Sequence, residues 1–133
     1  MKEIPIGTRG SYTTTVKPSD LAGTMDSSLP PVFATCMMSL AMEMAAMDAM
    51  RPFMEPGEMS VGIVVNVNHL AATPLGWRVT ARAEVTKVEG RRIEFNVTAE
   101  DEKEAIGTGF HSRAVMERTK FDQRLNAKSA AKP

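Results

Sequence analysis

One segment limits the possible folds of this chain more than any other: residues 32–50, which read VFATCMMSLAMEMAAMDAM. Nearly every position is apolar, and Ala, Met, Leu and Glu all favour the α-helix. An apolar helix of this kind in a water-soluble protein is enclosed by other elements. Glu43 and Asp48 argue against a membrane span, because each acidic side chain would cost about 2.5 kcal/mol or more near the bilayer centre. The sequence therefore predicts one long, enclosed helix and no membrane partner.

Short strands flank this helix along the chain. Residues 10–16 are rich in β-branched side chains and predict a first strand. After the helix, apolar and polar residues alternate over 61–69, 77–85 and 93–99, and a last strand is expected at 106–116. The short connections between these four segments predict an antiparallel meander. A sheet curled around one central helix buries both, so we expect the α+β class and the hotdog fold.

The chain has room for one domain. Its 133 residues predict a single domain over 1–120, followed at 121–133 by a short helix or flexible tail. A lone sheet of this size around one helix is thin, and pairing two copies removes a free edge, so we expect a homodimer. Sixteen Lys and Arg balance sixteen Asp and Glu, which gives no indication of a nucleic-acid partner.

Cysteine and histidine are too few for a closed structural zinc site, since the chain contains only Cys36, His69 and His111. The sequence also lacks a phosphate-binding loop, a dinucleotide fingerprint and a nucleophile elbow. We therefore expect neither a metal nor a cofactor. The N-terminus does not resemble a secretory signal and Cys36 has no intrachain disulfide partner, so a cytoplasmic location is expected.

Glu43 is the residue that an apolar helix does not explain. No basic side chain lies three or four positions away on the same helix, whereas Asp48 has Arg51 three residues on and is expected to be solvated and paired. A lone carboxylate must find a partner on another element or take up a proton. Such a carboxylate is a candidate functional group. Pattern alone equally allows an acid on one wet stripe, or one paired across a dimer interface.

His69 ends the alternation of residues 61–69, whose odd-numbered positions are expected to face the helix. A histidine in that position is more often a hydrogen-bonded core residue than a catalyst. Together with Glu43, however, it would supply general acid and base groups from two facing elements.

Three further side chains have alternative interpretations. The Thr35 hydroxyl either caps the helix start or faces an acyl carbonyl. Cys36 could be a nucleophile, but no histidine stands at a telling spacing, so it is expected to be a small packing residue. Arg113 could pair with Glu43, bind a phosphate or be exposed, and exposure is the commonest of these.

Several blocks, taken together and in order, closely resemble the fluoroacetyl-coenzyme A thioesterase family. They are residues 32–35 (VFAT), 42–43 (ME), 53–58 (FMEPGE), 68–74 (NHLAATP), 88–92 (VEGRR), 106–109 (IGTG) and 111–115 (HSRAV). The resemblance implies a dimeric hotdog thioesterase that hydrolyses acyl-CoA without a metal or redox cofactor. It also implies a catalytic triad of Thr35, Glu43 and His69.

The same resemblance implies a set of substrate-binding positions. The family's active-site glycine and arginine fall on Gly62 and Arg113, and Phe33 lies in the matching VFAT block. Leu29 stands where the family's fluoroacetate-resistance enzyme has an aromatic residue. That departure favours a short-chain or small substituted acyl-CoA over strict fluoroacetyl specificity.

Two other functions fit the same fold. A hotdog hydratase needs an acidic residue five positions before its histidine, where this chain has Val64, and this counts against it. A non-catalytic acyl-CoA-binding module would need none of the three triad side chains. The sequence therefore favours the thioesterase.

Overall fold

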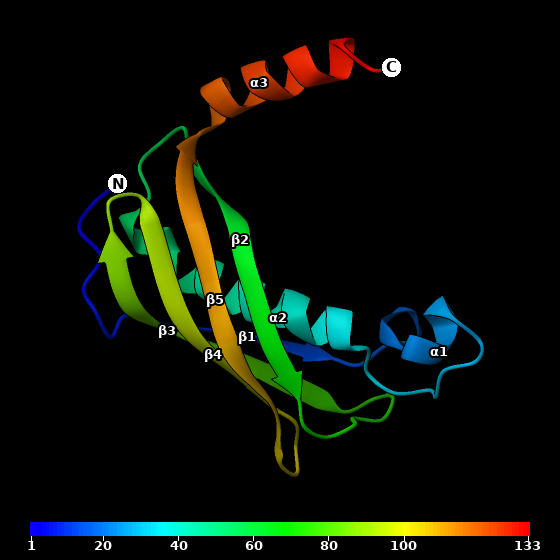
Figure 1. Ribbon diagram of the computed structural model, residues 1–133. Helices are drawn as coiled ribbons and strands as arrows, with labels where there is room; N and C mark the ends of the chain where they lie inside the picture. The colour runs from blue at the N-terminus through cyan, green and yellow to red at the C-terminus, as the bar shows by residue number, and fades with distance from the viewer.

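The computed structural model describes residues 1–133 and shows a five-stranded antiparallel sheet curled around one long helix (Figure 1). The elements in chain order are β1 (Arg9–Thr15), η1 (Pro18–Asp20), α1 (Ala22–Met25), α2 (Thr35–Met50), η2 (Arg51–Phe53), β2 (Glu58–His69), β3 (Arg78–Glu89), β4 (Arg92–Glu100), β5 (Ala105–Glu117) and α3 (Arg118–Ala130).

The strands follow the order β1-β3-β4-β5-β2 across the sheet. The predicted meander is correct for β3, β4 and β5 but wrong for β2, which pairs with β5 in a register that places His69 opposite Gly107. After β2 the chain crosses toward the opposite edge of the sheet, where β3 pairs with β1. In this pair Arg9 lies opposite Glu84. Alternation predicts that a segment is a strand, but it does not name the neighbouring strand. As a result β2 forms one free edge of the sheet.

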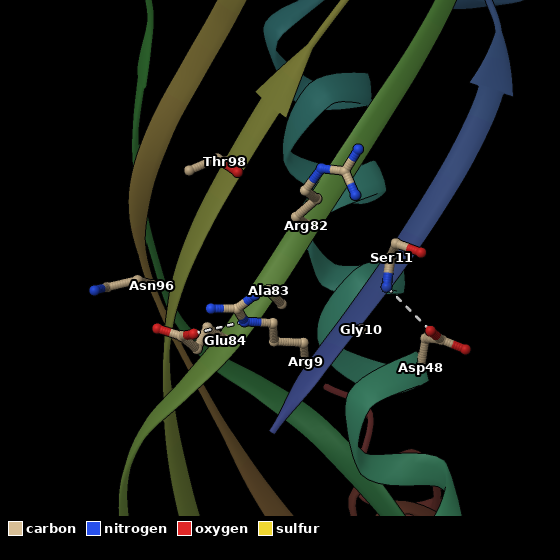
Figure 2. Close-up of a pocket in the computed structure, with 9 residues that line it drawn as sticks. All are labelled: Arg9, Gly10, Ser11, Asp48, Arg82, Ala83, Glu84, Asn96 and Thr98. Carbon is tan, nitrogen blue, oxygen red and sulfur yellow. Dashed lines mark hydrogen bonds and ion pairs between the residues drawn. The ribbon is translucent and has the colours of Figure 1, made fainter. Parts of the chain in front are cut away.

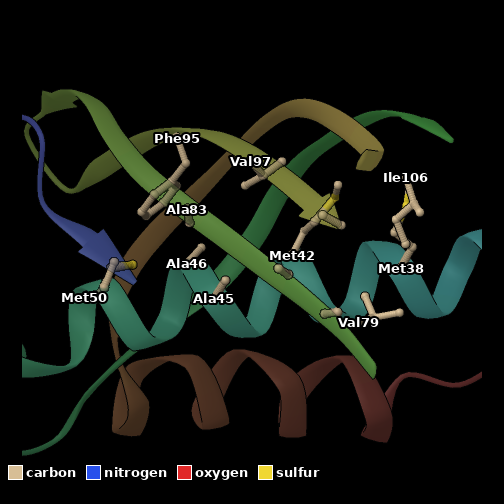
Figure 3. Packing of buried hydrophobic residues seen from close by; sticks show 14 of the residues in the cluster. Met38, Met42, Ala45, Ala46, Met50, Val79, Ala83, Phe95, Val97 and Ile106 are labelled. Carbon is tan, nitrogen blue, oxygen red and sulfur yellow. The ribbon is translucent and has the colours of Figure 1, made fainter. Parts of the chain in front are cut away.

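The core lies between the concave side of the sheet and one face of α2 (Figure 3). Small residues let helix and sheet approach closely, since a Cβ at Gly10 of β1 would overlap the Ala45 carbonyl oxygen. Flexible methionines fill the wider part: a Cβ at Gly107 would lie 2.5 Å from Sδ of Met38 and 3.1 Å from Cε of Met42. The methionine-rich sequence of α2 is thus mainly a feature of core packing.

The prediction of a helix enclosed on every side is wrong for the single chain. Leu40 is 46% exposed, and the side of α2 that carries Cys36, Leu40 and Glu43 is not fully covered. The helix also begins at Thr35 rather than at residue 32, because Val32 forms an isolated bridge with Pro74. An apolar helix face without a complete cover is therefore available beside β2.

The helix α3 continues from β5 and projects away from the sheet (Figure 1). It occupies most of the segment for which the sequence predicts a short helix or tail. None of the helices combines the length and the apolar character needed to cross a membrane.

Candidate functional site

Thr35 and His69 form the first half of the candidate site. Thr35 is the first residue of α2, and its Oγ1 lies 2.8 Å from Nδ1 of His69 at the end of β2. Ala34 is the N-cap residue and no side chain caps the helix, so the capping role considered for Thr35 is not observed. Nε2 of His69 is buried and has no hydrogen-bond partner. An unpartnered imidazole nitrogen is available to exchange a proton with a bound molecule.

Glu43 and Arg113 form the second half. Nη1 of Arg113 donates to Oε2 of Glu43 at 3.0 Å, and the two side chains are 5% and 31% exposed respectively. The helical carboxylate thus has a partner on another element, which was one of the alternatives. Nε of Arg113 donates to Oγ of Ser60 at 2.9 Å, and Nη2 donates to the Ser60 carbonyl at 3.0 Å. The expectation of an exposed Arg113 is wrong, and a buried guanidinium with these partners is not free to bind a phosphate.

A β-bulge in β2 brings Gly62 to the helix side of the sheet. Gly62 lies opposite Arg113 and Val64 lies opposite Ser112, so Ile63 has no counterpart on β5. This irregularity contradicts the even alternation expected over residues 61–69. A Cβ at Gly62 would lie 2.9 Å from Oε2 of Glu43. Glycine therefore leaves the space that the carboxylate occupies.

His111 is a member of the cluster that the sequence analysis did not identify. It is 1% exposed, and its Nδ1 lies 2.7 Å from the Val64 carbonyl oxygen while its Nε2 lies 3.3 Å from Nη1 of Arg113. Burial lowers the pKa of His111, and the charge of Arg113 lowers it further, against the opposing effects of the Val64 carbonyl and Glu43. Its position two residues before Arg113, on the same strand face, was the available signal.

An apolar cavity of about 490 Å³ adjoins the first half of the site. Thr35 and His69 contribute its polar groups, and Leu29 and Phe33 contribute apolar ones. The remaining lining residues are Ala22, Pro30, Val32, Ala34, Leu70, Ala71 and Ala72. An apolar cavity with few polar groups is the usual form of a small-molecule site. Of the four predicted substrate-binding positions, Leu29 and Phe33 lie in this cavity, whereas Gly62 and Arg113 do not.

The two halves are separate within one chain. Thr35 and Glu43 lie about two turns apart on α2, which is about 12 Å along the axis at a rise of 1.5 Å per residue. The structure thus joins Thr35 to His69 and Glu43 to Arg113 and Gly62, but it does not bond the first group to the second.

Comparison with known proteins identifies the family of this chain. The chain matches the family described as fluoroacetyl-CoA-specific thioesterase over residues 16–119. It is 46% identical over 105 residues to the fluoroacetyl-CoA thioesterase of Streptantibioticus cattleyicolor, an alignment that covers 79% of this chain and 76% of the relative. The chain belongs to the fluoroacetyl-CoA-specific thioesterase family.

Solved structures agree with this family assignment. The fluoroacetyl-CoA thioesterase FlK superposes with a TM-score of 0.89 at 37% identity, covering 99% of this chain and 100% of FlK. A thioesterase superfamily member from Thermus thermophilus gives a TM-score of 0.90 at 31% identity, with coverage of 99% and 100%. These matches confirm the predicted family, the α+β hotdog fold and the predicted enzyme class, a thioester hydrolase acting on acyl-CoA.

A second cavity of this thioesterase lies elsewhere, between β1, β3 and β4, and has a volume of about 430 Å³ (Figure 2). Its arginines already have partners, because Arg9 pairs with Glu84 at 2.8 Å and Arg82 pairs with Glu100 at 2.8 Å. None of the predicted site residues lines it. The chemistry of the family is therefore better matched by the apolar cavity beside His69.

The one cysteine of the chain, Cys36, lies at the surface. The prediction that Cys36 packs in the core is wrong: it is exposed, with Sγ 3.5 Å from Sδ of Met25. Cys36 lies four residues before Leu40 and seven before Glu43, on the side of α2 that the sheet does not cover. No group of three or more His, Cys, Asp or Glu side chains gathers as a metal site.

Proposed function

We propose that this chain hydrolyses the thioester of a short-chain or small substituted acyl-CoA, using Thr35, Glu43 and His69. The observation that carries the proposal is the Thr35–His69 hydrogen bond at the wall of an apolar cavity. Leu29 and Phe33 in the same cavity offer apolar contacts to a small acyl group, which supports them as substrate-binding positions. The reaction needs no metal or redox cofactor.

The chemistry divides between the two halves of the site. Glu43 either attacks the thioester carbonyl or removes a proton from the attacking water, and Arg113 and Gly62 fix where its carboxylate lies. When the Thr35 hydroxyl donates to Nδ1 of His69, the imidazole proton sits on Nε2. From there it passes to the sulfur of the leaving CoA as the carbon–sulfur bond breaks.

A homodimer would complete this site. In β2, Ile63 is 48% exposed and Val65 is 43% exposed, and the strand is a free edge beside the open face of α2. Two β2 strands paired antiparallel, with the twofold axis between Val65 and Asn66, place His69 of one copy opposite Gly62 of the other. Because Gly62 adjoins Glu43, this pairing brings the two separated halves together.

The dimer is tested by placing a charge on the free edge. Val65→Asp should convert a dimer into monomers in sedimentation velocity and abolish turnover, whereas Lys87→Asp on β3, an exposed substitution away from β2, should change neither. A wild-type protein that sediments as a monomer and is fully active contradicts the dimer.

Turnover itself is tested with purified protein and a panel of acetyl-, haloacetyl-, propionyl-, butyryl- and aryl-acyl-CoA. Free thiol should appear with at least one member, and Glu43→Gln or His69→Ala should abolish its release without changing the circular dichroism spectrum. Full activity in both variants would show that Glu43 and His69 are not the catalytic residues. Tight binding without turnover across the panel would instead support the acyl-CoA-binding module.

The proposed setting is cytoplasmic. The single cysteine, Cys36, is exposed and unpaired, as is common for thiols in a reducing compartment. Beyond the acyl-CoA substrate and a second copy of this chain, the proposed reaction requires no partner.

A further inference from the structure

His111 is a fully buried titratable side chain to which the proposed reaction assigns no role. It lies in β5, packed against the ring of Phe95 with 5.9 Å between ring centroids. The groups that face it come from four elements: the Val64 carbonyl from β2, Phe95 from β4, Arg113 from β5 and Glu43 from α2. A polar ring enclosed in this way must be hydrogen-bonded at both nitrogens to avoid a large desolvation penalty.

The partners of His111 allow only one protonation state. The Val64 carbonyl can only accept, so the proton of the imidazole is on Nδ1. Arg113 can only donate, so Nε2 must accept from Nη1. A proton on Nε2 would point at the N–H groups of a cation 3.3 Å away. The imidazole is therefore neutral, with a fixed tautomer.

The neutral ring links two features that shape the site. On one side it holds Val64, the residue that follows the bulge at Ile63 and so fixes the strand next to Gly62. On the other side it engages Nη1 of Arg113, the same nitrogen that donates to Oε2 of Glu43. A guanidinium nitrogen of this kind has two hydrogens, one for each partner.

We propose that His111 is a positioning residue of the site: its neutral imidazole fixes Nη1 of Arg113, and through it the Glu43 carboxylate, relative to the bulge of β2. This inference rests on the proposed function, since it assumes that the Glu43 carboxylate is the reacting group. Arg113 has two further bonds to Ser60 through Nε and Nη2, which set the plane of the rigid guanidinium, and His111 adds a third contact at Nη1 itself, beside the bond to Glu43.

Two amide substitutions test the two ring nitrogens of His111 one at a time. In His111→Asn the side-chain amide takes the place of Nδ1 and keeps the donor to Val64, but nothing accepts from Arg113. In His111→Gln the amide oxygen reaches the place of Nε2 and accepts from Arg113. We expect His111→Asn to lower kcat roughly 10- to 100-fold, the loss typical of a misplaced reacting group. KM should change little, because the cavity walls are untouched, and His111→Gln should recover most of kcat.

Thermal denaturation of both variants gives the structural control. If His111 only supported the fold, the loss of kcat in each variant would follow its loss of thermal stability. His111→Asn and His111→Gln would then have similar kcat values. The inference is wrong when His111→Asn keeps the wild-type kcat. It is equally wrong when both variants lose kcat alike and the side-chain N–H signals of Arg113 in the NMR spectrum stay at their wild-type positions.

The same NMR measurement separates this inference from the proposed function. In ligand-free protein the Arg113 side-chain signals should shift in His111→Asn and stay near wild type in His111→Gln. This holds whether or not any acyl-CoA is hydrolysed. Absence of turnover in the wild-type protein would contradict the proposed function. Unchanged Arg113 signals in His111→Asn would contradict the positioning role of His111.

Discussion

The Glu43 carboxylate lies against the backbone of Gly62: a Cβ on Gly62 would lie 2.9 Å from Oε2 of Glu43 and 3.5 Å from Nη1 of Arg113. The close approach comes from two elements far apart in the sequence, and the bulge at Ile63 turns Gly62 toward the helix. Because the atom in the way is the end of a side chain, an added methyl group displaces the carboxylate more readily than it disturbs the fold.

Gly62→Ala should therefore affect activity more than stability. We expect kcat to fall roughly 10- to 100-fold as the carboxylate shifts, while the free energy of unfolding in urea changes by less than about 1 kcal/mol. Thiol release and urea denaturation measure the two effects. A variant with unaltered kcat would show that the position of the Glu43 carboxylate is not critical.

Arg113→Lys should destabilise the protein although it keeps the charge. The guanidinium donates in four directions, to Glu43, His111 and both the hydroxyl and carbonyl of Ser60, which an ammonium cannot match. Losing two of these bonds predicts about 2 kcal/mol less stability in urea denaturation, together with a lower kcat. The matched control is Arg118→Lys, whose exposed pair with Asp122 predicts a change of at most about 0.5 kcal/mol. Equal effects of the two substitutions would contradict the role of the buried network.

Thr35→Val removes the partner of Nδ1 of His69 and keeps the shape of the side chain. The imidazole then loses the contact that fixes its orientation and proton, and kcat should fall at least roughly 10-fold. Thr35→Ser keeps the hydroxyl and should retain most of the activity. Turnover of both variants on one acyl-CoA measures the difference, and equal kcat values would show that the hydroxyl plays no part.

The sequence identifies candidate residues one at a time, but it does not predict the contacts between them. Glu43 is recognisable because its own helix offers no partner, yet the partner, Arg113, is 70 positions away and no local pattern identifies it. A period-two pattern does not reveal the bulge at Ile63. It therefore places Gly62 on the face of the sheet away from the helix, which is wrong. His111 was missed because its role depends on the register between β2 and β5, and register is set by tertiary packing.

Acid stability depends on a contact at the other end of β2. The carboxylate of Glu58 accepts from the N-terminal amine of Met1 at 2.8 Å, from the backbone N–H of Glu55 at 2.9 Å and from Arg91 at 3.0 Å. These contacts, the N-terminal amine foremost, lower the pKa of Glu58 from 4.5 to about 2.

The direction of the pH effect follows from this lowered pKa. Glu58 contributes stability that is fully present above about pH 4.5 and is lost as the pH falls through about 2. Glu58→Gln should lower the free energy of unfolding at neutral pH and flatten its decline between pH 4.5 and 2. Urea denaturation across that range measures both effects, with Glu89→Gln, an exposed carboxylate 73% accessible beside Lys87, as the matched control. Parallel pH profiles for Glu58→Gln and the wild type would show that the amine does not stabilise the folded carboxylate.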